Sequence, residues 1–238
     1  MSGRFIGVGV GPGDPELITL KAARLIGEAN VVSYIANPKG ASQARSIAAG
    51  LLDGAATQQR ELPVPLPMSE QRDLANRAYD EAAVSIQACL DQGLTVVFLC
   101  EGDPLFFGSF AYLLARLETG NRCDVVPGIS SVNAASSALR MPLTVQGESF
   151  AVISGRHDEA KLVEVLQSQD SVVIMKAGRA RPRILRALAA TGRTHEARYL
   201  EYIGRDNEAI VTDVNRLEAE AGPYFSIFVV TRSAREIR

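Results

Sequence analysis

Residues 4–23 read RFIGVGVGPGDPELITLKAA. The apolar run at 4–10 predicts a β-strand, and glycines at alternate positions lead it into a turn. Asp14 and Pro15 then predict the start of a helix over 14–28, because Asp is favoured at the N-cap and Pro at the first helical position. A strand, a glycine-rich turn and a helix in this order are typical of a parallel α/β sheet.

The glycine-rich turn matches neither of two common phosphate-binding motifs. A dinucleotide fingerprint needs glycines at relative positions one, three and six, and no register that starts at Gly7, Gly9 or Gly11 has a glycine at the sixth position. A Walker loop needs glycine directly before its lysine, and Lys21 follows a leucine. The turn is therefore not predicted to bind a nucleotide phosphate.

The rest of the chain alternates short apolar runs with helical periodicity, which predicts an α/β fold of two α/β/α lobes with mostly parallel sheets. The expected strands are 4–10, 31–35, 94–100, 124–126, 149–154, 171–175, 197–202, 208–212 and 224–231, with the proline-rich segment 61–69 as an edge strand or an extended connection. The expected helices are 14–28, 42–51, 71–92, 108–118, 131–139, 159–167 and 181–190, with a short one near 214–221.

A break at Pro142 and Gly147 divides this pattern. We therefore expect an N-terminal lobe over 1–141, which carries the glycine and proline loops, and a C-terminal lobe over 142–238. The last two strands of the second lobe are expected to pair with each other, antiparallel, at a sheet edge.

The amino-acid composition excludes several classes of protein for this chain. Among 238 residues, 47% are hydrophobic and 22% charged, with a net charge of −2, which argues against a protein that coats nucleic acid. No apolar run reaches the roughly 18 residues of a membrane helix, and the chain starts on a strand pattern rather than a signal peptide, so we expect a cytoplasmic protein. Cys89, Cys100 and Cys123 are widely spaced, and we expect buried thiols and no metal site.

The opening turn has two partners further along the chain. After the strand expected at 94–100, Gly102-Asp103-Pro104 repeats Gly13-Asp14-Pro15, and after the strand at 124–126 comes PGISS at 127–131. All three are strand-to-helix turns, so they should meet at the carboxyl edge of one sheet, where open α/β sheets bind ligands. A single Gly-Asp-Pro is also an ordinary helix start, so the inference depends on all three turns.

Three carboxylates in these turns indicate the chemical class of the ligand. Asp14, Glu101 and Asp103 would repel a phosphate but suit hydroxyls, an ammonium or a sulfonium. The predicted ligand is a nucleoside-like molecule with a positive charge.

At this point the chain resembles a known family. GVGVGPGDPELITLKAA at 7–23, LCEGDPLFFGSFAYL at 99–113 and VVPGISS at 125–131 are similar to the successive signatures of the tetrapyrrole methylases, the S-adenosylmethionine-dependent enzymes of cobalamin and sirohaem synthesis. The resemblance covers the whole chain in order. Within the family, the wording of the first two motifs most resembles the precorrin-2 C(20)-methyltransferases.

The resemblance implies S-adenosylmethionine in a cleft between the lobes, S-adenosylhomocysteine as product, precorrin-2 as the tetrapyrrole substrate, and a homodimer. No nucleic-acid or membrane partner is expected. One implied cofactor-binding residue, Met175, has an alternative interpretation as a core methionine at the end of a strand. The implied cofactor-binding residues are Pro12, Glu101, Gly102, Asp103, Phe106, Ser130, Ser131, Met175 and Gly204.

A basic stretch of the chain is suited to bind the carboxylates that such a substrate carries. Residues 176–205 carry eight Lys and Arg residues against two Glu, and arginine pairs well with carboxylates. An ordinary solvated helix face over 179–193 is the alternative. The hypothesised substrate-binding residues are Lys39, Arg156, Lys176, Arg179 and Arg181.

Several points stay open at the level of sequence. The proton lost from C(20) could pass to Glu101 or Asp103, and nothing selects one, so no catalytic residue is assigned. The acceptor could be metal-free or cobalt-containing, or be methylated at another ring position, and the same fold serves diphthamide and ribosomal-RNA methylases. A non-catalytic S-adenosylmethionine-binding module is the alternative of a different class.

Overall fold

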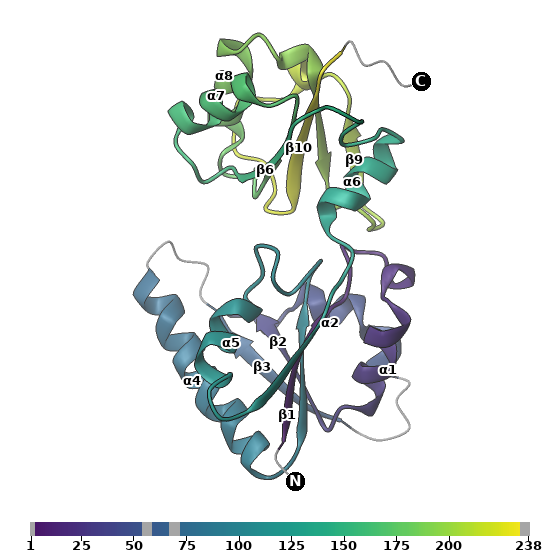
Figure 1. Cartoon of the computed structure of the whole chain (residues 1–238), viewed down its shortest axis with the longest axis vertical. Helices are drawn as coiled ribbons and strands as arrows, with labels where there is room; N and C mark the ends of the chain where they lie inside the picture. Colours follow the sequence, from purple (N-terminus) through teal and green to yellow (C-terminus); the bar gives the residue numbers. More distant parts are fainter. Residues whose placement is uncertain (1–2, 54–58, 67–71, 234–238) are drawn as a thin grey trace. The chain divides into compact units, whose positions relative to one another are not determined.

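The computed structural model describes residues 3–53, 59–66 and 72–233. The chain divides into two compact units, Met1–Ser130 and Ser131–Arg238, which are described separately (Figure 1). The lobe boundary expected from the sequence lies between 141 and 142. Here the division falls before helix α6 (Ser131–Leu139) rather than after it.

The first unit contains a five-stranded sheet in the order β3-β2-β4-β1-β5, in which every neighbouring pair is parallel. The described part of the proline-rich segment forms the edge strand β3, as expected, since proline cannot donate to a second neighbour. Residues 67–69 of that segment lie outside the described residues. The strands are β1 (Arg4–Gly9), β2 (Val31–Ala36), β3 (Arg60–Pro65), β4 (Thr95–Cys100) and β5 (Arg122–Val126).

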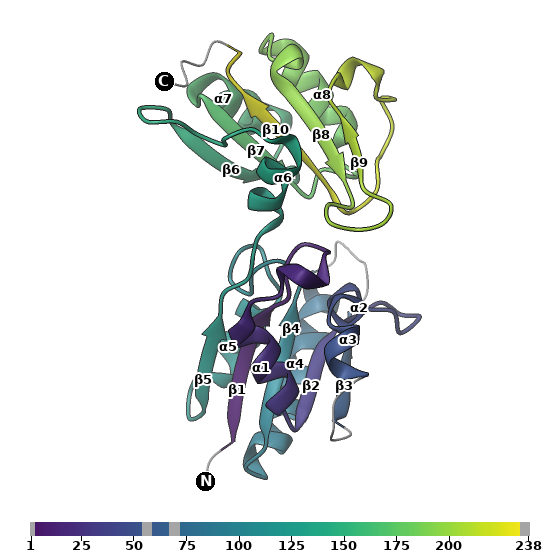
Figure 2. The ribbon, with the colours of Figure 1, turned by 90° about the vertical axis from the view of Figure 1, so that its right-hand side faces the viewer.

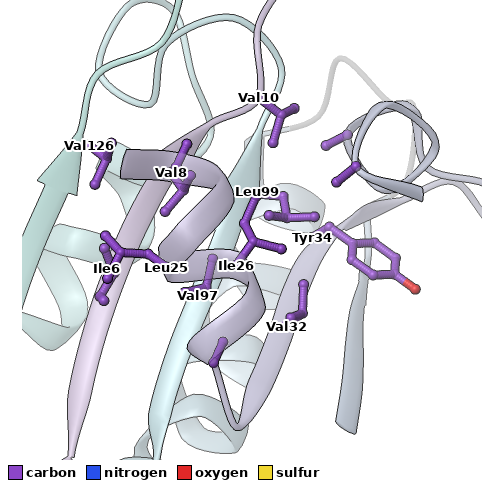
Figure 3. Packing of buried hydrophobic residues seen from close by; sticks show 14 of the residues in the cluster. Ile6, Val8, Val10, Leu25, Ile26, Val32, Tyr34, Val97, Leu99 and Val126 are labelled. Atoms are coloured by element: carbon purple, nitrogen blue, oxygen red, sulfur yellow. The ribbon is translucent and has the colours of Figure 1, made fainter. Parts of the chain in front are cut away.

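Helices cover both faces of this sheet, because alternate side chains of its strands point to opposite sides. On one face, Ile6 and Val8 of β1 pack with Leu25 and Ile26 of α1 (Figure 3). On the other face, aromatic side chains of β1, β4 and α5 form the centre of the second core cluster. The helices are α1 (Leu20–Glu28), α2 (Gln43–Ile47) and α3 (Ala49–Leu52) on the first face, and α4 (Arg72–Asp91) and α5 (Phe110–Leu117) on the second.

The first expected helix differs from the structure. Asp14 accepts a hydrogen bond from the Glu16 N–H at 2.8 Å and caps only a short 3-10 helix, Pro15–Leu17. Ile18 is extended, and Thr19 then caps α1 by accepting from the Ala22 N–H at 3.2 Å. The segment has two caps in succession, so the helix expected over 14–28 begins only at Leu20. The helix expected over 42–51 is likewise divided at Ala48 into α2 and α3.

The second sheet corrects two expectations. Its order is β6-β7-β10-β8-β9, and only β6 and β7 are parallel, while the other three pairs are antiparallel. The sheet is thus not mostly parallel, and the last two strands do not pair with each other. The strands are β6 (Phe150–Ser154), β7 (Ser171–Met175), β8 (Ala197–Glu201), β9 (Ala209–Val211) and β10 (Ser226–Thr231).

Burial explains why β10 lies at the centre. All six of its residues are buried, which is the property of a strand covered on both faces. The short β9 is largely exposed and pairs only with β8 at the edge. Helices α7 (Glu159–Ser168) and α8 (Arg181–Ala190) pack on one face of the sheet, and α6 lies on the other (Figures 1 and 2).

Candidate functional site

The three predicted turns meet at the carboxyl edge of the first sheet, because β4, β1 and β5 are parallel neighbours. Gly11 and Gly102 form an isolated bridge between the first and second turns, in which the Gly102 N–H donates to the Gly11 carbonyl at 2.7 Å. Both glycines have positive φ, at 81° and 65°, which L side chains rarely adopt. Glycine at these two positions is therefore a requirement of the turn geometry.

The third turn packs against the other two without room for side chains. A Cβ atom at Gly128 would lie 2.1 Å from the Gly102 carbonyl oxygen and 2.7 Å from the Gly9 Cα atom. A Cβ atom at Gly9 would lie 2.5 Å from the same oxygen. The backbone of the three turns is thus in direct contact, as expected from the sequence.

The carboxylate of Asp103 connects two of the turns. Its Oδ1 accepts from the Leu105 N–H at 2.9 Å, within its own turn, and its Oδ2 accepts from the Gly128 N–H at 3.0 Å, in the third turn. Glu101, two residues earlier, is exposed. The two carboxylates predicted for this turn therefore have different surroundings.

The other residues predicted near these turns lie in them or directly after them. Pro12 is buried, and Phe106 is half-buried with its ring edge-to-face against Phe107 at a centroid distance of 5.2 Å. Ser130 and Ser131 are half-buried, and Ser131 begins α6. The structure thus gathers seven of the predicted cofactor residues in and just after three short turns: Pro12, Glu101, Gly102, Asp103, Phe106, Ser130 and Ser131.

Met175 and Gly204 lie at a common edge of the second sheet. Strands β7 and β8 flank β10 and are both antiparallel to it, so their carboxyl ends lie where β10 begins. Met175 ends β7 and is half-buried, and Gly204 follows β8 with a φ of 74°. The Gly204 N–H donates to Glu208 Oε2 at 2.7 Å.

Two of the predicted cationic residues come together at the same edge. The Gly155 N–H donates to the Met175 carbonyl at 2.7 Å, which places Arg156 beside Lys176. Lys176 is half-buried with a φ of 56°. Burial and the neighbouring charge of Arg156 lower the pKa of the Lys176 ammonium. Two adjacent cations, one of them partly desolvated, favour an anionic ligand.

Arg181 has a different environment from the one expected. Its side chain is 9% exposed; its Nε donates to the Glu220 carbonyl at 2.6 Å, and its guanidinium lies over the Tyr199 ring at 5.8 Å. The reason is helical spacing, because Arg181 shares the buried face of α8 with Ile184 and Leu188. Its cationic group therefore fixes the loop before β10. Lys39 and Arg179 are exposed.

The basic stretch 176–205 is in large part structural. Arg193 is 3% exposed and donates to Glu196 at 2.5 Å and to the carbonyls of Leu166, Gln169 and Asp170. Arg186 forms an exposed ion pair with Glu159 at 2.9 Å. Only part of the local positive charge therefore remains for an anionic partner.

A cluster of aromatic rings beside Gly204 could not be predicted from the sequence. The Arg205 guanidinium lies 3.9 Å from the centroid of the Phe225 ring, and Tyr202, at a φ of 51°, lies 6.4 Å from the same ring. Tyr224 is 50% exposed and edge-to-face with Phe225. These residues come from separate loops, and no spacing in the sequence connects them.

Other features of the described residues bear on the chemistry. Cys89 and Cys100 are buried free thiols, and Cys123 is half-buried; burial raises the pKa of the Cys100 thiol, which makes it a poor nucleophile. In residues 3–53, 59–66 and 72–233, no group of three or more His, Cys, Asp or Glu side chains could hold a metal ion. None of the helices in this part of the chain combines the length and the apolar character of a membrane span.

Comparison with known proteins gives the site its context. The family of tetrapyrrole (corrin/porphyrin) methylases matches residues 4–218. A precorrin-2 C(20)-methyltransferase of Sinorhizobium sp is 38% identical over 236 residues, which cover 96% of this chain and 95% of the relative. A cobalt-precorrin-2 C(20)-methyltransferase of Salmonella typhimurium is 30% identical over 234 residues, which cover 98% of each.

A solved structure agrees with these matches. Uroporphyrin-III C-methyltransferase from Thermus thermophilus, complexed with S-adenosylhomocysteine, superposes with a TM-score of 0.68 at 25% sequence identity, covering 96% of this chain and 92% of that one. The family model, the two relatives and the solved structure each match most of the chain. The chain therefore belongs to the tetrapyrrole (corrin/porphyrin) methylase family.

Proposed function

We propose that the protein transfers the methyl group of S-adenosylmethionine to C(20) of precorrin-2 in cobalamin biosynthesis. The observation that carries the proposal is the contact of the three glycine turns at one sheet edge, through Gly11, Gly102 and Gly128. Two relatives that match over nearly their whole length, both named C(20)-methyltransferases, support the ring position.

The residues present fit S-adenosylmethionine. Glycines at the turns let backbone approach a ligand closely, and the exposed Glu101 carboxylate suits hydroxyls and a cationic sulfonium. In the second unit, Met175 and Gly204 stand at one sheet edge. The proposed cofactor-binding residues are Pro12, Glu101, Gly102, Asp103 through its backbone, Phe106, Ser130, Ser131, Met175 and Gly204.

The chemistry requires mainly alignment. S-adenosylmethionine supplies an already activated methyl group, and the carbon between two reduced pyrrole rings is a nucleophile of enamine type. Holding two reactants in line can contribute about 7–11 kcal/mol to lowering the barrier. Both Asp103 oxygens accept backbone N–H groups, whereas the Glu101 side chain is exposed at the turn, and Glu101 is proposed to accept the C(20) proton. Glu101→Gln should lower kcat more than it weakens S-adenosylhomocysteine binding.

Basic side chains of both units are proposed to bind the tetrapyrrole carboxylates. Arg156 and Lys176 lead this set because they lie side by side at the sheet edge. Lys39 and Arg179 are exposed and remain in it. Arg181 is not part of the proposed set, since its guanidinium holds the loop before β10.

One assay separates the candidate functions. The protein is incubated with S-adenosylmethionine and either precorrin-2 or its cobalt complex, and the product is analysed by mass spectrometry. One added methyl group with matching S-adenosylhomocysteine is expected, and NMR of the product should place the methyl group at C(20). Comparing the two acceptors decides between the metal-free and the cobalt pathway, since relatives carry both names. Cofactor binding without transfer to either would indicate a binding module.

We further propose a homodimer in the cytoplasm, with no nucleic-acid or membrane partner. Exposed apolar side chains in the first unit support the dimer: Leu105 is 54% exposed, Phe107 43% and Tyr112 52%. Exposed apolar side chains of one chain can pack against a second copy. Light scattering after size-exclusion chromatography should give twice the mass of the 25.5 kDa chain.

A further inference from the structure

The second glycine turn is tied to its two neighbours in different ways. A backbone hydrogen bond joins it to the first turn, from the Gly102 N–H to the Gly11 carbonyl. Its tie to the third turn uses a side chain, because the Gly128 N–H donates to Asp103 Oδ2 at 3.0 Å. Residue 103 thus decides whether this second tie exists.

Both oxygens of Asp103 serve the backbone. The bond from the Leu105 N–H to Oδ1 fixes the orientation of the carboxylate within its own turn, and Oδ2 is thereby held toward Gly128. A carboxylate acceptor makes a charge-assisted bond, which is stronger than one to a neutral group. The glycine contacts around Gly128 leave its backbone little alternative position.

Asp14 provides an internal comparison. It stands in the same Gly-Asp-Pro sequence, and its Oδ1 accepts from the Glu16 N–H two residues ahead, as Asp103 does from Leu105. For Asp103 alone of these two, the structure also records a bond to another turn. The bond across the turns is therefore not a general consequence of the motif.

We propose that Asp103 is a positioning residue, which acts on cofactor binding by holding the PGISS turn at 127–131 against the second turn through the Gly128 N–H. The inference rests on the proposed function and deepens it. The backbone and serines of the third turn reach the cofactor in their binding arrangement only while this bond is made. Direct contact between the Asp103 side chain and the cofactor is not needed for the effect.

The test uses the full chain and two measurements. The first is amide hydrogen exchange at Gly128, followed by NMR without ligand, and the second is calorimetric titration with S-adenosylhomocysteine. Asp103→Ala should abolish the exchange protection of Gly128 and raise the dissociation constant about tenfold, which corresponds to about 1.4 kcal/mol. Asp103→Asn keeps one oxygen acceptor and should restore part of both properties together.

Controls make the outcomes distinguishable. Asp14→Ala should leave the protection of Gly128 unchanged, and circular dichroism checks that each variant folds. If Asp103→Ala weakens binding while Gly128 stays protected, the residue acts by direct contact and the proposal is wrong. It is also wrong if protection is lost and affinity is unchanged. If the wild-type protein does not bind S-adenosylhomocysteine although Gly128 is protected, the proposed function fails rather than the tie between the turns.

Discussion

At the scale of single residues, the glycines of the first unit differ sharply in the space around them. Gly128 and Gly9 face backbone atoms within 2.7 Å of any Cβ atom, and backbone cannot move aside as a flexible side chain can. Gly27, inside α1, has no atom within 4 Å of such a Cβ. The sequence shows glycine at all three positions, and only the structure shows which of them has room for a side chain.

Gly128→Ala should therefore destabilise the protein. Inserting a methyl group into a packed site costs about 1–3 kcal/mol, and the same change should weaken S-adenosylhomocysteine binding by displacing the third turn. Gly27→Ala is the matched control and should raise stability by about 0.5–1 kcal/mol, because glycine is a poor helix former. Thermal denaturation of the three proteins checks the order; equal midpoints for both variants would contradict the packing argument.

At the scale of elements, an ion-pair network fastens the edge strand of the first sheet. Tyr34 on β2 donates to Glu61 on β3, and Arg45 on α2 donates to Glu61 at 3.0 Å and to Asp53 at 2.8 Å. The Arg45 guanidinium, and secondly the Tyr34 hydroxyl, lower the pKa of the Glu61 carboxyl. Burial, with the Glu61 bond second, raises the pKa of Tyr34 to about 12.

This network gives a pH-dependent prediction. A carboxyl whose pKa is lowered by folding stabilises the protein above its ordinary value of 4.5, and the contribution is lost as the pH falls through the folded value. Glu61→Gln should cost about 0.5–1 kcal/mol at pH 7, since the group is partly exposed and screened. Urea denaturation at pH 7 and below pH 4 should show the difference from wild type shrinking in acid. A constant difference would rule out the ionised network as its source.

Arg181 gives a second prediction for an element. Arg181→Met removes the donor to the Glu220 carbonyl and the ion pair with Glu201, whose atoms lie 3.8 Å apart. Leaving buried polar groups unpaired costs about 1–3 kcal/mol, so the variant should unfold earlier. The folded variant should keep its KM for the tetrapyrrole. Arg186→Met, on the exposed face of the same helix, is the control and should change stability by less than about 0.5 kcal/mol.

The elements also show what the sequence could and could not predict. Helix α8 and strand β7 begin and end where expected, because amphipathic spacing marks the helix and a continuous apolar run marks the strand. The three turns and their common edge follow from strand-to-helix order alone. The place of β10 between β7 and β8 does not follow from that order, since strand order in a sheet depends on pairing between distant segments. Nor does the burial of Arg181, because an arginine at a helix start usually faces water.

At the scale of the whole molecule, the net charge of −2 conceals a local cationic site. Arg156 and Lys176 stand at the sheet edge of the second unit, while Arg193 and Arg186 are paired with glutamates. The proposed carboxylate site would therefore attract an anionic substrate to this edge rather than to the molecule as a whole. Such attraction weakens as salt screens the charges.

Arg156→Gln and Lys176→Gln should each raise the KM for the tetrapyrrole about tenfold, in line with about 1.5 kcal/mol for a hydrogen bond to a charged group. S-adenosylhomocysteine affinity should change much less. Arg186→Gln, which alters an exposed cation already paired with Glu159, should leave the KM unchanged. Steady-state kinetics at two salt concentrations measure this, and unchanged tetrapyrrole KM in both variants would refute the carboxylate site.

The central place of β10 affects how the chain acquires its structure during synthesis. The first sheet is complete once β5, ending at Val126, has left the ribosome. In the second unit, β7 and β8 both pair with β10, and β10 is synthesised last, at residues 226–231. Until then both strands have an unpaired edge, and such edges recruit other chains. The nascent protein should thus pass through a stage with one finished half and one aggregation-prone half, when chaperones would matter most.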